Sequence, residues 1–130
     1  MLEQLSIHLT AAILGIMVFF SFIIAPITFN VLNEENARKF IRKVFPFYYN
    51  VNFALSVFIT SIYFFKENIS ISFYLILLVT ILFFVSCYIL MPLINKYRDN
   101  NLDKKFKYLH FTSVVFNFVQ IIILIFLLIY

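Results

Sequence analysis

Charged residues divide the chain into four long apolar stretches. Its ten basic and six acidic residues fall at Glu3, between Glu34 and Lys43, at Lys66–Glu67 and between Lys96 and Lys107. The windows 4–33, 44–65, 68–95 and 108–130 carry no charge. A helix needs roughly 20 apolar residues to cross a bilayer, so each window predicts one membrane span. We expect spans at about 5–32, 46–65, 70–94 and 107–130.

The charged segment between the first two spans has a helical pattern of its own. Apolar residues recur at helix spacing, at Ala37, Phe40, Ile41, Val44 and Phe45. Asn33 is suited to an N-cap, and Glu34 and Glu35 follow in the first turn, where the helix dipole favours acids. The pattern predicts an amphipathic helix over about 34–45 that lies on the membrane surface, and Pro46 then begins the second span. A groove for a partner protein is the functional alternative.

The predicted fold class is all-α. The link over 66–70 is short, so the second and third spans are expected to be antiparallel neighbours. The whole chain, 1–130, then forms a single membrane domain. We predict an integral membrane four-helix bundle with up-down-up-down topology, plus the short interfacial helix.

Composition and charge support a membrane location and suggest an orientation. The chain is 64% hydrophobic and 12% charged, whereas soluble proteins average about 25% charged residues. Lys and Arg gather in the first and third connections, and the opposite side has only Lys66 among its basic residues. The positive-inside rule therefore predicts a multi-pass protein of a bacterial inner (cytoplasmic) membrane with both termini in the periplasm. The lipid bilayer is the expected partner, and nucleic acid is not.

Polar residues inside two of the spans fall on narrow helix faces. His110, Ser113, Asn117 and Gln120 share one face of the fourth span, and Asn52, Ser56 and Thr60 share one face of the second. Polar groups that face lipid lack partners, so both faces should turn inward and meet. We call six of these residues the polar seam: Asn52, Ser56, Thr60, Ser113, Asn117 and Gln120. The seam either bonds helices together or lines a binding site.

Histidines are the candidate cofactor ligands, because an ionisable residue within a span is a functional candidate. His8 lies on one face with Ala11, Ala12 and Gly15, a pattern of small residues that permits close helix packing. His8 and His110 are expected about 20 Å apart in height, which excludes one shared haem or metal. No metal-ligand spacing occurs around these histidines or Cys87, so no metal site is predicted. No span carries Asp or Glu and no catalytic motif occurs, which favours a non-enzymatic protein.

Several sequence features occur in an order typical of a known family. They are HLTAAILGIMVFFSFIIAPITFNVL, the charged amphipathic loop, FPFYY, PLINKYRD and YLHFTSVVFNFVQ. The chain resembles the four-helix domain family typified by human transmembrane protein two-hundred-five, whose function is unknown. The resemblance implies four membrane helices in a bacterial inner membrane. A more distant similarity to copper-resistance D proteins and membrane protoporphyrinogen oxidases implies haem or copper.

These features leave competing functional hypotheses. The first is a non-enzymatic helix-bundle or assembly module, acting as a homo-oligomer or with a membrane protein partner, without a cofactor. The alternative is a membrane-embedded site that binds or transports a small molecule, a haem or a metal. A haem-dependent oxidoreductase using His8 or His110 is the third hypothesis.

Overall fold

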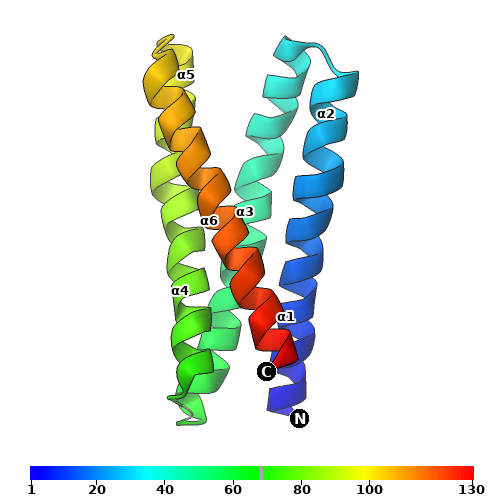
Figure 1. Ribbon diagram of the computed structural model, residues 1–130, viewed down its shortest axis with the longest axis vertical. Coiled ribbons are helices and arrows are strands. Elements are labelled where there is room, and N and C mark those ends of the chain that lie inside the picture. Colours follow the sequence, from blue (N-terminus) through cyan, green and yellow to red (C-terminus); the bar gives the residue numbers. More distant parts are fainter. Residues whose placement is uncertain (68) are drawn as a thin grey trace.

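The computed structural model describes residues 1–67 and 69–130. It consists of four long helical rods, and each rod runs antiparallel to the one before it in the chain (Figure 1). Their elements are α1 (Leu2–Phe19), η1 (Phe20–Ile24), α2 (Ala25–Val31), α3 (Glu34–Phe65), α4 (Ile71–Val85), η2 (Ser86–Leu90), α5 (Met91–Asp99) and α6 (Asp103–Ile129). The predicted all-α four-helix fold is confirmed. Both termini lie at one end of the bundle, called the terminal end, and the two basic connections lie at the other, called the basic end (Figure 1).

Three of the four rods have the length and apolarity to cross a membrane. These are the helices over Leu2–Val31, Ile71–Asp99 and Asp103–Ile129, among the residues that the structure describes. The fourth rod, α3, contains the predicted second span but does not reach the same apolarity. Polar residues lower the hydropathy of this rod; Asn52 and Ser56 are fully buried on its inward face, whereas Asn50 is exposed.

The prediction of a separate surface helix over 34–45 is wrong. Residues 34–45 and the second span form the single helix α3, 32 residues long, and Pro46 lies inside it. Ion pairs from Glu34 to Arg98 and from Arg42 to Asp99 hold the first turns of α3 against α5. These contacts favour an upright helix over one lying on the bilayer. The predicted N-cap is confirmed, since the Asn33 side chain accepts a hydrogen bond from the Asn36 backbone N–H at 2.9 Å.

Two π-helical turns interrupt the first and third rods at matching places. Each lies directly before a helix that has a proline at its second residue, η1 before Pro26 and η2 before Pro92. Proline has no backbone N–H, so it cannot donate to the carbonyl four residues earlier, which falls within the π-helical turn in both cases. In each rod the helix irregularity next to the proline is therefore a π-helical turn.

The connection between α5 and α6 is a compact helix cap. Asn101 has a positive φ of 55°. The Leu102 N–H donates to the Tyr97 carbonyl at 2.9 Å, and the Asn101 N–H donates to the Arg98 carbonyl at 3.2 Å. This is the Schellman pattern, with Asn in the left-handed position that it tolerates better than most residues. The cap reverses the chain, so α6 starts beside α5.

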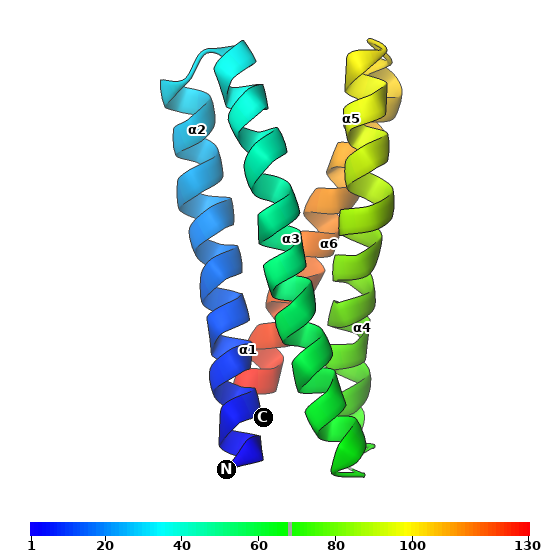
Figure 2. The same ribbon diagram turned by 180° about the vertical axis from the view of Figure 1, so that it is seen from behind.

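The bundle is tightly packed toward the terminal end and splayed at the basic end. The fully buried core residues include Ile13, Met17, Ile59, Ile76, Phe83 and Leu124. Helix α6 crosses the molecule diagonally, from α5 at the basic end to α1 at the terminal end (Figures 1 and 2). Over the described chain, the α3 backbone packs on α1, α2, α4 and η2 but not on α5 or α6. The α2–α3 pair therefore diverges from the α5–α6 pair at the basic end.

The small-residue face of α1, whose pattern permits close helix packing, does not pack within the bundle. His8, Ala11, Ala12 and Gly15 are exposed, and a Cβ added at Gly15 would have no atom within 4 Å. The buried face of α1 is instead formed by Ser6, Thr10, Ile13 and Met17. Ser6 and Thr10 can be buried because each hydroxyl donates to a carbonyl one turn earlier in α1.

Candidate functional site: a cavity at the basic end

A cavity of about 400 Å³ lies between the diverging helix pairs. Both π-helical turns contribute to its lining, η1 through Phe20, Ser21 and Phe22 and η2 through Ser86 and Leu90. Its volume is within the range of about 300–1,000 Å³ typical of small-molecule sites. The predicted seam residues Ser113 and Asn117 line it together with His110.

A chain of hydrogen bonds forms the floor of the cavity, defined here as Ser21, Tyr48 and Asn117. The Tyr48 hydroxyl donates to the Asn117 side-chain oxygen at 3.0 Å, and the Asn117 amide donates to the Ser21 hydroxyl at 2.9 Å. These bonds join α3, α6 and η1. Phe20 stacks on the Tyr48 ring with centroids 4.5 Å apart. The floor is thus a satisfied polar network beneath aromatic side chains.

The walls of the cavity are mostly apolar and reach the lipid-facing surface on one side. Phe45 and Tyr49 stack with centroids 5.5 Å apart on the α3 side. Phe22 and Phe118 also line the cavity, although they are 57% and 50% exposed. Their rings meet edge to face at 6.4 Å. These two exposed rings close the cavity on the side between η1 and α6, which we call the lateral edge.

Arginines surround the mouth of the cavity at the basic end. We define the mouth as Glu34, Arg38, Arg42 and Arg98, all of which line the cavity. One oxygen of Glu34 accepts hydrogen bonds from both Arg38 and Arg98, each at 2.8 Å. Since α3 and α5 do not touch through their backbones, these side chains bridge the mouth.

A second ion pair crosses the same gap beyond the apolar part of the helices. Both guanidinium NH₂ groups of Arg42 donate to the Asp99 carboxylate. One of them also approaches the Asn95 carbonyl at 3.5 Å. Hydrogen bonding from Arg42 holds the pKa of the Asp99 carboxyl below its ordinary value, and the positive charges of Arg42 and Arg38 add to the effect. Asp99 is therefore ionised at neutral pH, and the pair is intact.

His110 lies between the mouth and the floor. Its ring is nearly parallel to the ring of Phe106, with centroids 5.7 Å apart. The Arg98 guanidinium lies 4.8 Å from the centroid of the same Phe106 ring. The described residues offer no hydrogen-bond partner to the His110 imidazole. His110 is exposed at the surface and lines this largely apolar cavity.

The polar seam does not form one continuous site. Ser113 and Asn117 line the cavity, whereas Gln120 is buried and donates to the Val79 carbonyl of α4 at 3.2 Å. Thr60 hydrogen-bonds Thr80 of α4 at 3.0 Å. The predicted meeting of the two seam faces is therefore wrong. The diagonal course of α6 takes it onto α4 and α1, away from α3.

Two seam residues are buried in α3 and bond only along their own helix. The Asn52 amide donates to the Tyr48 carbonyl at 2.8 Å, and the Ser56 hydroxyl donates to the Phe53 carbonyl at 2.8 Å. The side-chain oxygen of Asn52 is buried and has no partner among the described residues. An unsatisfied buried acceptor destabilises the fold, so Asn52 is not accounted for by packing alone.

His8 is far from the cavity. It lies in the N-terminal half of α1, toward the terminal end, and its Nδ1 contacts the Gln4 carbonyl of the same helix at 2.6 Å. Helix α6 begins at the basic end, so His110 lies toward the opposite end of the bundle (Figure 1). The two candidate ligands are not brought together. Within residues 1–67 and 69–130, no group of three or more His, Cys, Asp or Glu side chains is placed to hold a metal ion.

Sequence reasoning did not single out several residues of this site. Ser21 lies in an apolar span with no periodic polar neighbours, and the three mouth arginines lie in the basic segments, which indicated only the orientation of the chain. The signal that could have located them was the pair of prolines, Pro26 and Pro92. A proline near the same end of two antiparallel partners of α3 marks a level at which helices bend and a cavity can form.

Comparison with known proteins places the chain in a family without an assigned activity. An uncharacterized protein of Aquifex aeolicus is 40% identical over 55 residues, a stretch that is 42% of this chain and 42% of that protein. No solved structure matches. A family model described as "Domain of unknown function (DUF4149)" matches residues 8–102. Because that match covers well over half of the sequence, the chain belongs to the DUF4149 family.

Proposed function

We propose that this protein is a non-enzymatic, membrane-embedded binding protein for a small amphipathic molecule, which occupies the cavity at the basic end. The observation that carries the proposal is the cavity itself. It combines apolar and aromatic walls with a polar floor, an unpartnered imidazole and a positively charged mouth. Binding sites for small molecules are built in this way, from mostly apolar surfaces with a few convergent polar groups.

The division of the polar seam supports binding over packing alone. Toward the terminal end, Thr60 and Gln120 bond to α4 and are the interhelical contacts that a packing role requires. Toward the basic end, Ser113 faces the cavity beside His110, and its hydroxyl donates only to the His110 carbonyl of its own helix. An assembly module has no need of polar side chains that face a cavity. A role in a homo-oligomer or with a membrane protein partner remains compatible with this site.

The proposed setting is a bacterial inner membrane with the basic end in the cytoplasm and both termini in the periplasm. Clustering of Lys and Arg at one end of the bundle supports this orientation through the positive-inside rule. The bacterial source of the relative is consistent with it. In this orientation the mouth opens at the level of the cytoplasmic headgroups, and the Phe22–Phe118 pair separates the cavity from the lipid.

A haem or copper cofactor, as the distant resemblance implies, fits these residues poorly. His8 and His110 lie toward opposite ends of the bundle, so two histidines cannot ligate one haem within the chain. The resemblance to the family of human transmembrane protein two-hundred-five stays a prediction and names no activity. An absorption spectrum of the detergent-purified protein tests the haem hypothesis. A Soret band that disappears in His110→Ala would favour haem over the proposed ligand.

A matched pair of cavity variants tests the proposed function. Ser113→Phe places a ring in the cavity, whereas Val115→Phe adds the same ring on the exposed side of α6, away from the lining. Native mass spectrometry of the full chain, titrated with hexadecanol or hexadecanoate, reports binding. We expect a saturable 1:1 adduct with at least one amphiphile in the wild type and in Val115→Phe, and its loss in Ser113→Phe. Absence of a saturable adduct, or equal binding by both variants, would overturn the proposal.

A further inference from the structure

We infer that the amphipathic ligand is a single-chain anion, whose headgroup binds at the arginine mouth and whose chain lies along the apolar walls. This inference rests on the proposed function and names the ligand class of the same site. It follows from the charge of the mouth, the position of His110 and the shape of the cavity.

The charge of the mouth favours an anion. Arg42 is neutralised by Asp99, but the single carboxylate of Glu34 serves both Arg38 and Arg98. One positive charge is therefore in excess at the mouth. A guanidinium group has five donors, and a single bond to Glu34 leaves most of the donors of Arg38 and Arg98 to other acceptors. A carboxylate or phosphate oxygen is the acceptor that arginine binds most strongly.

His110 extends the headgroup site into the cavity. The Arg98 guanidinium and the His110 imidazole are both placed against Phe106, and both residues line the cavity. An anion bound at Arg98 therefore lies near Phe106, whose ring also contacts the His110 imidazole. That imidazole has no hydrogen-bond partner in the described chain. A neutral imidazole donates one hydrogen bond, so His110 adds a donor to the cavity lining.

The apolar remainder of the cavity fits one alkyl chain. The floor is closed by the Tyr48–Asn117–Ser21 bonds, which leave few polar groups for a second headgroup. Phe22 and Phe118 bound the cavity at the lateral edge, and a longer chain has to part these two exposed rings to reach the bilayer. About 400 Å³ leaves little room for a two-chain lipid.

Amphiphiles matched in chain length test this inference on the full chain in zwitterionic nanodiscs. Hexadecanoate, hexadecanol and hexadecyltrimethylammonium share one chain length and differ in headgroup charge, and dipalmitoyl phosphatidylglycerol supplies a two-chain anion. We expect hexadecanoate to bind at least about tenfold more tightly than each of the other three. Arg98→Gln should weaken hexadecanoate binding about tenfold and leave hexadecanol binding unchanged. Lys105→Gln, a charge change outside the cavity lining, is the matched control and should alter neither.

The outcomes separate this inference from the proposed function. Equal binding of hexadecanol and hexadecanoate, blocked by Ser113→Phe, would leave the binding function standing and overturn the anionic ligand. Phosphatidylglycerol binding as tight as hexadecanoate would overturn the single-chain claim. If Arg98→Gln lowers the melting temperature, Arg38→Gln replaces it, because Arg38 shares the same Glu34 oxygen. No binding by any amphiphile would overturn both proposals.

Discussion

Individual polar residues in this bundle have different environments although they follow the same helical spacing. Asn117 exchanges two hydrogen bonds with other helices, whereas Asn52 has a buried oxygen without a partner in the described chain. The sequence predicted that both are buried, because asparagine facing lipid is costly. It could not predict their partners, which depend on the direction in which α6 crosses the bundle.

Substituting each of the two asparagines with leucine should therefore affect the stability of the fold differently. Asn117→Leu removes two interhelical bonds and leaves the Tyr48 hydroxyl unpartnered, so we expect a loss of about 1 kcal/mol, at roughly 0.6 kcal/mol per membrane hydrogen bond. Asn52→Leu removes an unsatisfied acceptor at similar volume and should leave stability unchanged or raise it. Thermal unfolding in one detergent measures both. A larger loss in Asn52→Leu would show that its oxygen binds an essential group.

At the scale of elements, sequence reasoning located the helices but misjudged two of their faces. Charge gaps and the Asn33 cap gave the helix positions, because burial in lipid and capping act locally. The upright start of α3 was not predicted, since it depends on Arg98 and Asp99, more than 50 residues further along the chain. The outward face of Gly15 was not predicted for a different reason: small residues permit close helix packing but do not require it.

The ion pair that crosses the mouth should respond to acid. The pKa of Asp99 is lowered in the folded protein, so the pair stabilises the fold above the ordinary carboxyl pKa of 3.8, and this contribution is lost as the pH falls through the lowered value. We expect Asp99→Asn to lower the melting temperature at pH 7 by an amount that shrinks below pH 3.8. The double variant Arg42→Gln/Asp99→Asn should match Asp99→Asn at pH 7 if Arg42 acts through this pair. A difference that is constant with pH would contradict the assignment.

The π-helical turn before Pro26 should depend on that proline. Pro26→Ala restores a backbone N–H that can close a regular α-helical turn across Phe22, one of the cavity-lining residues of η1. We expect a straighter first rod, a narrower cavity and weaker hexadecanoate binding with little change in thermal stability. Pro46→Ala is the control, because Pro46 lies inside α3 without a π-helical turn beside it. Equal effects of the two variants on hexadecanoate binding would show that the cavity does not depend on Pro26.

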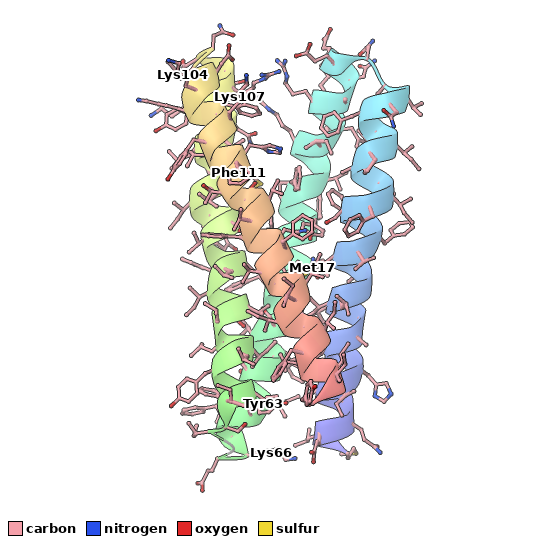
Figure 3. All side chains as sticks on the ribbon, viewed as in Figure 1. Met17, Tyr63, Lys66, Lys104, Lys107 and Phe111 are labelled. Carbon is pink, nitrogen blue, oxygen red and sulfur yellow. The ribbon has the colours of Figure 1, made fainter. Side chains whose placement is uncertain are left out.

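At the scale of the whole molecule, the splayed basic end distinguishes this bundle from one that is packed along its whole length. Figure 3 shows Lys107 and Phe111 near the start of α6 at the basic end, and Tyr63 and Lys66 at the terminal end. Four antiparallel helices were predictable from charge and hydropathy. The opening between them was not, because a crossing angle arises from the packing of many side chains over the full length of the helices.

Thiol labelling tests most directly whether this opening exists in a membrane. In a Cys87→Ala background, Ser113→Cys places a thiol in the cavity and Val115→Cys places one on the lipid-facing side of the same helix turn. A charged, water-soluble methanethiosulfonate is applied to the full chain in liposomes. We expect fast labelling at position 113, slowed by hexadecanoate, and very slow labelling at position 115. Equally slow labelling at both positions would show that side chains or lipid fill the space, and would contradict a binding cavity.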